Sequence, residues 1–208
     1  MTSDRGLTAL YARGHRWHLV LAGLASIPLT EWWLGSLNLV LPGSHQPLVF
    51  RLLAPAVVAA LFVGNRHTPM FDWEATAARS PGTVYGAFLA GSLLLGALVT
   101  FIAQLLLNDS ETALIVLRAF IIFTGLALIS ARLFSWRTAW ILPLGSYFPL
   151  TYLQTDSQGQ SRWWDWSSQP ASSLPCWTLA VLILVIGTLL LLLTPHLIGG
   201  LRKWFNRH

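Results

Sequence analysis

Long apolar runs separated by short polar links constrain the fold of this chain more than any motif does. The runs cover about residues 17–41, 47–65, 83–107, 113–133, 138–154 and 175–199. A helix of roughly 20 apolar residues crosses a bilayer core of about 30 Å. Of the 208 residues, 54% are hydrophobic and 10% are charged, whereas an ordinary soluble domain carries about 25% charged residues. We therefore expect an all-α, polytopic membrane protein: one domain over residues 1–208 with six transmembrane helices.

Two of these runs need comment. The first run lacks a small-residue cleavage site, so we interpret it as a retained span and not as a signal peptide. The fifth run, within "WILPLGSYFPLTYLQ", is short and contains Pro143 and Pro149. Proline is tolerated inside a span where neighbouring helices satisfy the freed carbonyl groups. The sequence therefore predicts a kinked or partly re-entrant fifth span.

The basic residues predict the orientation, because Lys and Arg are retained on the cytoplasmic side of a membrane. With six spans, one side carries Arg5, Arg13, Arg16, Arg66, Arg79, Arg132, Arg137, Arg202, Lys203 and Arg207. The opposite side carries Arg51 and Arg162 with several acidic residues. We expect a protein of the cytoplasmic (inner) membrane with both termini in the cytoplasm. The net charge of +5 then reflects topology and not binding to nucleic acid.

The stretch "TPMFDWEATAARSP", residues 68–81, lies in the cytoplasmic link between the second and third spans. Thr68 can cap a helix, Asp72 and Glu74 suit its positive end, and Arg79 suits its negative end. So short a helix is marginal alone in water. A membrane surface could hold it, but its acidic residues fit an anionic leaflet poorly. The pattern favours a protein partner.

The order of four features resembles the transmembrane (permease) subunit of an ABC transporter of the type-2 exporter family. These are the basic entry segment "RGLTALYARGHRW" (5–17), the six spans with both termini inside, the short helix "FDWEATAARS" (71–80), and the aromatic outer segment "SRWWDWSS" (161–168). The resemblance implies that residues 69–80 form the coupling helix, which docks on a nucleotide-binding subunit. It also implies that residues 155–175 form an outer aromatic loop.

If the chain is such a permease, the contact with the ATPase falls on the coupling helix, at Phe71, Asp72, Trp73, Glu74 and Arg79. The chain contains no GxxxxGK[ST] phosphate loop. The resemblance therefore implies a non-enzymatic subunit that binds no cofactor or metal itself, with ATP and Mg on the partner. A second permease copy or a homologous permease and membrane lipid complete the expected partners. The implied cargo is a peptide, an antibiotic or a lipid-like compound.

Polar and aromatic residues near the outer half of the spans are candidates for the transport path or its gate. They are Glu31, Gln104, Arg118, Trp163, Trp164 and Trp166. Arg118 inside a span indicates function, because an ionisable residue there costs about 2.5–3.5 kcal/mol. Alternatively, its side chain extends outward to Glu111, two turns away. The tryptophans suit either the membrane interface or a gate, and the interface is the simpler interpretation.

Two other classes of function remain open. The chain could be a membrane-embedded binding or immunity protein that works without an ATPase. It could also be a six-span intramembrane enzyme using Ser146 and His196, although the GxSG pattern of rhomboid-like proteases is absent. Within "GAFLAGSLLLGAL" (86–98), Gly86 and Ala90 are four residues apart and are followed by Gly91 and Gly96. This spacing of small residues predicts close helix packing and is silent about cargo.

Overall fold

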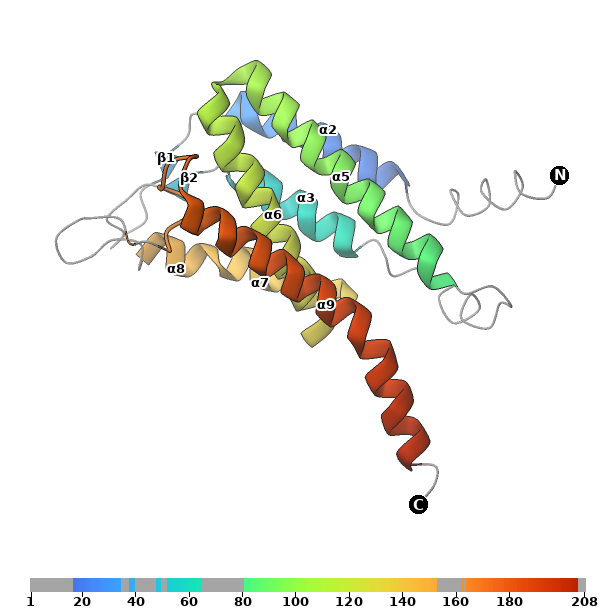
Figure 1. Ribbon diagram of the computed structural model, residues 1–208. Helices are drawn as coiled ribbons and strands as arrows, with labels where there is room; N and C mark the ends of the chain where they lie inside the picture. Colours follow the sequence, from blue (N-terminus) through green and yellow to red (C-terminus); the bar gives the residue numbers. More distant parts are fainter. Residues whose placement is uncertain are drawn as a thin grey trace, which may run out of the picture.

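The computed structural model (Figure 1) describes residues 17–34, 38–39, 48–49, 52–64, 81–152, 162 and 164–205. Its helices are α2 (Trp17–Leu34), α3 (Leu53–Gly64), α5 (Pro81–Leu107), α6 (Ser110–Leu133), α7 (Ile141–Gly145), α8 (Tyr147–Tyr152) and α9 (Leu174–Phe205), with the 3-10 turn η2 (Trp136–Thr138). Strands β1 (Asn38–Leu39) and β2 (Leu48–Val49) form a small antiparallel pair. The described part of the chain is therefore a helical bundle, as the sequence predicts.

Three stretches in α5, α6 and α9 are long and apolar enough to cross a membrane: Leu89–Leu107, Ser110–Leu133 and Leu174–Leu191. At 1.5 Å per residue, the 24 residues of α6 cover about 36 Å, which exceeds a bilayer core of about 30 Å. The fold is thus that of a helical membrane protein. These helices correspond to the third, fourth and sixth predicted spans.

The first two predicted spans are shorter as helices than expected. Residues 38–39 and 48–49 pair as strands, with Asn38 opposite Val49, so the predicted boundaries at 41 and 47 are wrong. Pro42, Gly43 and Pro47 lie between the strands, and such residues favour a turn over a continuous helix. The 12 residues of α3 cover only about 18 Å.

The fifth apolar run is broken, as its prolines predict. It forms η2, α7 and α8, and α7 ends at Gly145. At the junction the hydroxyl of Ser146 donates to the carbonyl of Pro143 at 2.6 Å. Ser130 Oγ of α6 donates to Thr138 O at 2.7 Å and so fastens the start of this segment to α6.

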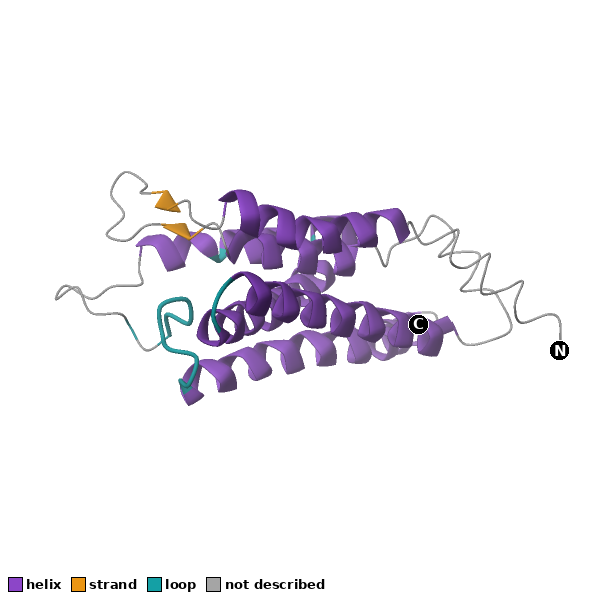
Figure 2. Cartoon of the chain, turned by 90° about the horizontal axis from the view of Figure 1, so that it is seen from above, coloured by secondary structure: helices purple, strands orange, loops and turns teal. Residues whose placement is uncertain are grey.

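The helices run back and forth between two ends of the bundle (Figures 1 and 2). The N-terminal ends of α2 and α5 and the C-terminal ends of α3 and α9 lie towards one end of the bundle. The β1–β2 pair and the segment before α9 lie at the other end. We call these the terminal end and the strand end. The link 65–80, which contains the predicted coupling helix, follows α3 and precedes α5 in the sequence and lies outside the described residues.

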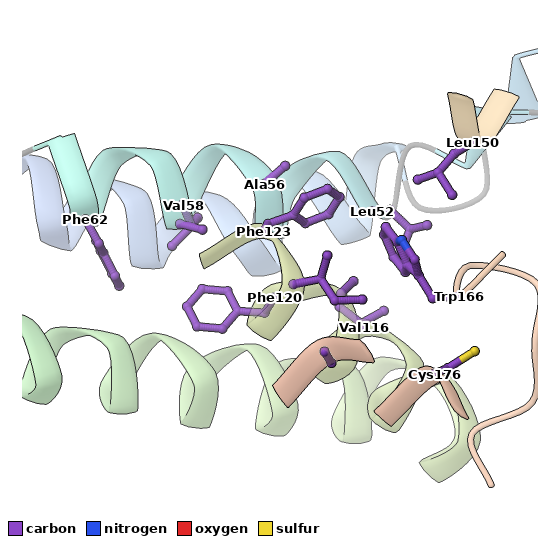
Figure 3. Close-up of a cluster of buried hydrophobic side chains, with 14 of the residues drawn as sticks. Leu52, Ala56, Val58, Phe62, Val116, Phe120, Phe123, Leu150, Trp166 and Cys176 are labelled. Atoms are coloured by element: carbon purple, nitrogen blue, oxygen red, sulfur yellow. The ribbon is translucent and has the colours of Figure 1, made fainter. Parts of the chain in front are cut away.

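Helix α6 is the centre of the bundle. It packs most extensively on α9, and then about equally on α3 and α5. Of its residues, Val116, Phe120 and Phe123 are almost fully buried. Figure 3 shows side chains of α3, α6 and the segment before α9 converging in one apolar cluster. The core therefore ties helices from both halves of the chain to one element.

α6 and α9 approach each other at two glycines. A Cβ atom at Gly125 would lie 2.7 Å from the carbonyl carbon of Ile183, and one at Gly187 would lie 2.7 Å from Gly125 O. These neighbours are backbone atoms, which cannot move aside as a side chain can. Small residues at both positions are what permits this contact between the helices.

Candidate functional site

Arg118 is completely buried on α6, towards the strand end of the bundle. Its guanidinium group donates three hydrogen bonds to backbone carbonyls. Nη1 donates to Pro170 O at 3.0 Å, and Nη2 donates to Trp166 O at 2.5 Å and to Gln169 O at 2.7 Å. All three acceptors lie in the turns that precede α9. We call this segment, residues 164–173, the outer cap, after the outer loop that the sequence predicts there.

Arginine suits this position for a physical reason. Its planar guanidinium carries five N–H donors in a fixed fork, so one side chain can hold several carbonyl groups at once. The turn through Ser167 and Ser168 lies between Trp166 and Pro170. The carbonyl groups of Trp166, Gln169 and Pro170 accept from Arg118 of α6. A buried charge must be paired or hydrogen-bonded to be tolerated. Here the cap supplies the acceptors.

Asp165 organises the cap from within. Its side chain is fully buried. Oδ1 accepts from the backbone amide of Ser167 at 3.1 Å and from its hydroxyl at 2.6 Å, and Oδ2 accepts from the hydroxyl of Ser168. Its carboxylate also has a favourable Coulomb interaction with Arg118. Asp165 thus shapes the turn and supplies a negative charge close to the buried guanidinium.

Trp166 anchors the cap in the apolar core. Its side chain is 5% exposed and meets Phe123 of α6 edge to face, with ring centroids 5.3 Å apart (Figure 3). Phe123 in turn stacks on Tyr147 of α8 at 5.6 Å. At the end of the cap, Trp177 Nε1 donates to Ala171 O at 2.8 Å. Aromatic packing and hydrogen bonds therefore hold the cap at separate points.

Two sequence-based interpretations need correction. The alternative in which Arg118 extends to Glu111 is wrong, because the guanidinium turns to the cap and Glu111 is exposed. The simpler interpretation of Trp166 as an interface residue is also wrong, because this side chain lies in the core. By contrast, Trp32 and Trp33 are 78% and 79% exposed, which suits a membrane interface.

The other candidate path residues do not gather into one site in the described structure. Gln104 is buried on α5, and Asn108 Nδ2 donates to its Oε1 at 3.0 Å. Trp164 is partly buried and packs on the main core cluster. Glu31 lies in α2, but its side chain is outside the described residues, and Trp163 is outside them altogether.

The coupling-helix residues Phe71, Asp72, Trp73, Glu74 and Arg79 also lie outside the described part of the chain. The sequence reasoning did not identify Asp165, Ser167, Ser168 and Pro170 as a structural unit. The motif "DWSSQP" (165–170) contains a signal that could have found them, because Asp followed by Ser and Pro favours a side-chain-stabilised turn.

Two observations concern metal-binding groups and the candidate catalytic residues Ser146 and His196. Within them, no group of three or more His, Cys, Asp or Glu side chains could hold a metal ion. The hydroxyl of Ser146 is engaged with the carbonyl of Pro143 at the α7–α8 junction. The side chain of His196, its proposed partner, is outside the described residues.

Among the described residues, three helices of membrane-spanning length and composition indicate a helical membrane protein. No protein-family model, curated protein or solved structure matches the chain.

Proposed function

We propose that this chain is the transmembrane subunit of an ABC exporter and that a separate nucleotide-binding subunit powers it. In this proposal the apolar segments cross the cytoplasmic membrane six times, with both termini inside. Helices α2 and α3 and the broken α7–α8 segment provide the three crossings beyond α5, α6 and α9. Residues 69–80 form the coupling helix on the cytoplasmic face.

The observation that carries the proposal is the position of the two helices that flank the link 65–80. α3 ends and α5 begins at the terminal end, and both pack directly against α6. α6 in turn holds the outer cap through Arg118. A partner that moves the link therefore has a continuous packed path to the opposite end of the bundle. Mechanical coupling between ATP hydrolysis and transport requires such a path.

The sequence of the link supplies the expected docking chemistry. Trp73 and Phe71 give an aromatic anchor, and Glu74 and Arg79 give charges near its rim. Buried aromatic residues dominate the affinity of small interfaces, and charge pairs orient them. The chain carries no phosphate-binding loop, so ATP and Mg belong to the partner. The cargo class is a peptide, an antibiotic or a lipid-like compound that crosses between apolar helices.

The test is co-purification of an ATPase with the tagged full-length chain from its native membrane. We expect an ATP-hydrolysing subunit to be retained with the wild-type chain and to be lost with Trp73→Ala. Thr76→Ala, on the polar side of the same predicted helix, is the matched control and should retain it. Glu74→Lys should keep insertion intact but uncouple ATP hydrolysis from transport.

Absence of any ATPase from the wild-type preparation, together with normal function of Trp73→Ala, would contradict the proposal. That result would favour a membrane-embedded binding or immunity protein that works without an ATPase. Loss of function on Ser146→Ala, accompanied by loss of a proteolytic activity, would instead favour the intramembrane enzyme.

A further inference from the structure

We infer that Arg118 and the outer cap form a latch, which holds the strand end of the bundle closed and opens when Arg118 releases the cap carbonyls. If the chain is an exporter, this latch is its outer gate, and that role depends on the proposed function. The latch itself is a property of the chain alone. It can be measured without a partner or a cargo.

The hydrogen bonds within the cap come from different side chains than the three hydrogen bonds that Arg118 makes between the cap and α6. Asp165, Ser167 and Ser168 hold the cap together internally. By contrast, Arg118 provides three hydrogen bonds between the cap and α6, and all of them come from one side chain. A rotation of that side chain would remove all three together. The cap could therefore move as a preformed unit.

The acceptors are suited to reversible release. Backbone carbonyls are neutral, so their separation from Arg118 does not leave an unpaired carboxylate behind. Asp165, the nearby acid, keeps its own three donors within the cap. The cap is otherwise attached by the apolar contact of Trp166 with Phe123 and by the hydrogen bond from Trp177 Nε1 to Ala171 O. Opening would expose this apolar surface, which is what an amphipathic cargo could contact.

The chain contains its own reporter for opening. Cys176 is its single cysteine. It lies in the first turn of α9, directly after the cap, and is 1% exposed. It belongs to the same apolar cluster as Trp166 (Figure 3). A thiol reagent reaches such a group only when the surrounding structure opens.

The experiment measures the rate at which a small neutral maleimide alkylates Cys176 in the full-length protein in detergent micelles. We expect slow modification of the wild type and an increase of about 10- to 100-fold in Arg118→Gln, because several charge-assisted hydrogen bonds to the cap are lost. Arg118→Lys should give a smaller increase, since an ammonium group keeps the charge but lacks the planar fork.

A second variant keeps the test valid if Arg118→Gln does not fold. Asp165→Asn alters the cap outside any helix, because it weakens the hydrogen bonds from Ser167 and Ser168 that shape the turn, and it should also accelerate alkylation. The matched control is Arg162→Gln, which removes an exposed arginine beside the cap and should leave the rate unchanged. Circular dichroism and gel filtration verify that each variant remains folded.

Three results would overturn the inference. They are fast alkylation of the wild type, an unchanged rate in folded Arg118→Gln and Asp165→Asn, and an equal acceleration by Arg162→Gln. None of these depends on whether an ATPase binds residues 69–80. A failure of the latch is therefore distinguishable from a failure of the proposed function.

Discussion

The crossing of α6 and α9 at Gly125 gives a prediction with a magnitude that follows from the structure. An alanine Cβ at Gly125 would lie 2.7 Å from the carbonyl carbon and 2.8 Å from the oxygen of Ile183, whereas ordinary contacts begin at 3.4 Å. The helices would have to separate by about 0.7 Å or more to relieve this overlap. Overpacking of this kind costs about 1–3 kcal/mol.

The matched control is Gly91→Ala on α5. Gly91 is exposed, and an added Cβ there meets no atom within 4 Å. Both substitutions gain about 0.5–1 kcal/mol because alanine favours a helix more than glycine does. That gain cancels between the two variants, so their difference isolates the overlap. We expect Gly125→Ala to be less stable than Gly91→Ala by about 1–3 kcal/mol.

The assay is unfolding of the purified protein by increasing SDS in mixed micelles, followed by circular dichroism. Gly187→Ala should behave like Gly125→Ala, because its Cβ also meets backbone, at 2.7 Å from Gly125 O. Gly96→Ala should be milder, since its closest neighbours are the rings of Phe62 and Phe120, which can shift. Equal unfolding midpoints for Gly125→Ala and Gly91→Ala would refute the reasoning.

Substitutions at three further positions, Trp166, Asp109 and Ser130, test contacts within the bundle. Trp166→Ala should lower the free energy of unfolding by about 3–5 kcal/mol in the same assay, because it empties a core site. Its control is Trp33→Ala at a 79% exposed position, which should change the free energy of unfolding by less than about 0.5 kcal/mol. Asp109→Ala should lower the free energy of unfolding by about 0.5–2 kcal/mol, because the Asp109 side chain accepts from the amide of Thr112 at the start of α6. Asp109→Asn should retain most of this stability. Ser130→Ala removes a donor to η2 and should cost about 1 kcal/mol, with faster amide exchange in η2 but not in α9. Equal effects of Trp166→Ala and Trp33→Ala would contradict the core position of Trp166. Equal effects of the two Asp109 substitutions would contradict its role as a helix cap. Equal changes of amide exchange in η2 and α9 in Ser130→Ala would contradict the attachment of η2 through Ser130.

The long helices of the bundle could be predicted from the sequence because hydrophobic length is a local property. The runs 83–107, 113–133 and 175–199 correspond to α5 (Pro81–Leu107), α6 (Ser110–Leu133) and α9 (Leu174–Phe205). The broken fifth run could be predicted for the same reason, because Pro143 and Pro149 act on their own turns. The ends of the first two runs could not, since strand pairing between residues 38–39 and 48–49 replaced helix there.

The partners of Arg118 could not be predicted from the sequence. Its acceptors are backbone carbonyls about 50 residues away along the chain, and every residue has such a carbonyl. From the sequence, the expected partner is therefore Glu111, the nearest acid on the same helix face. Only the three-dimensional structure brings the cap over α6 and shows that Asp165 is the acid close to Arg118.

Glycine spacing also has limits as a predictor of packing. Gly96 contacts the core as expected, but Gly91 in the same stretch is exposed. A close backbone contact between helices instead joins Gly125 and Gly187, which are far apart in the sequence. Helix crossing depends on the relative orientation of two elements, and neither helix encodes that alone.

The sidedness of the link 65–80 relative to the outer cap tests the account most directly, because a coupling helix and an outer latch must lie on opposite sides of the membrane. The measurement uses a Cys176→Ser background with one cysteine introduced by either Thr76→Cys or Arg162→Cys. Intact cells are treated with a membrane-impermeant maleimide. The account predicts labelling of Arg162→Cys in intact cells, and labelling of Thr76→Cys only after the membrane is opened. Labelling of both positions in intact cells, or of Thr76→Cys alone, would contradict it.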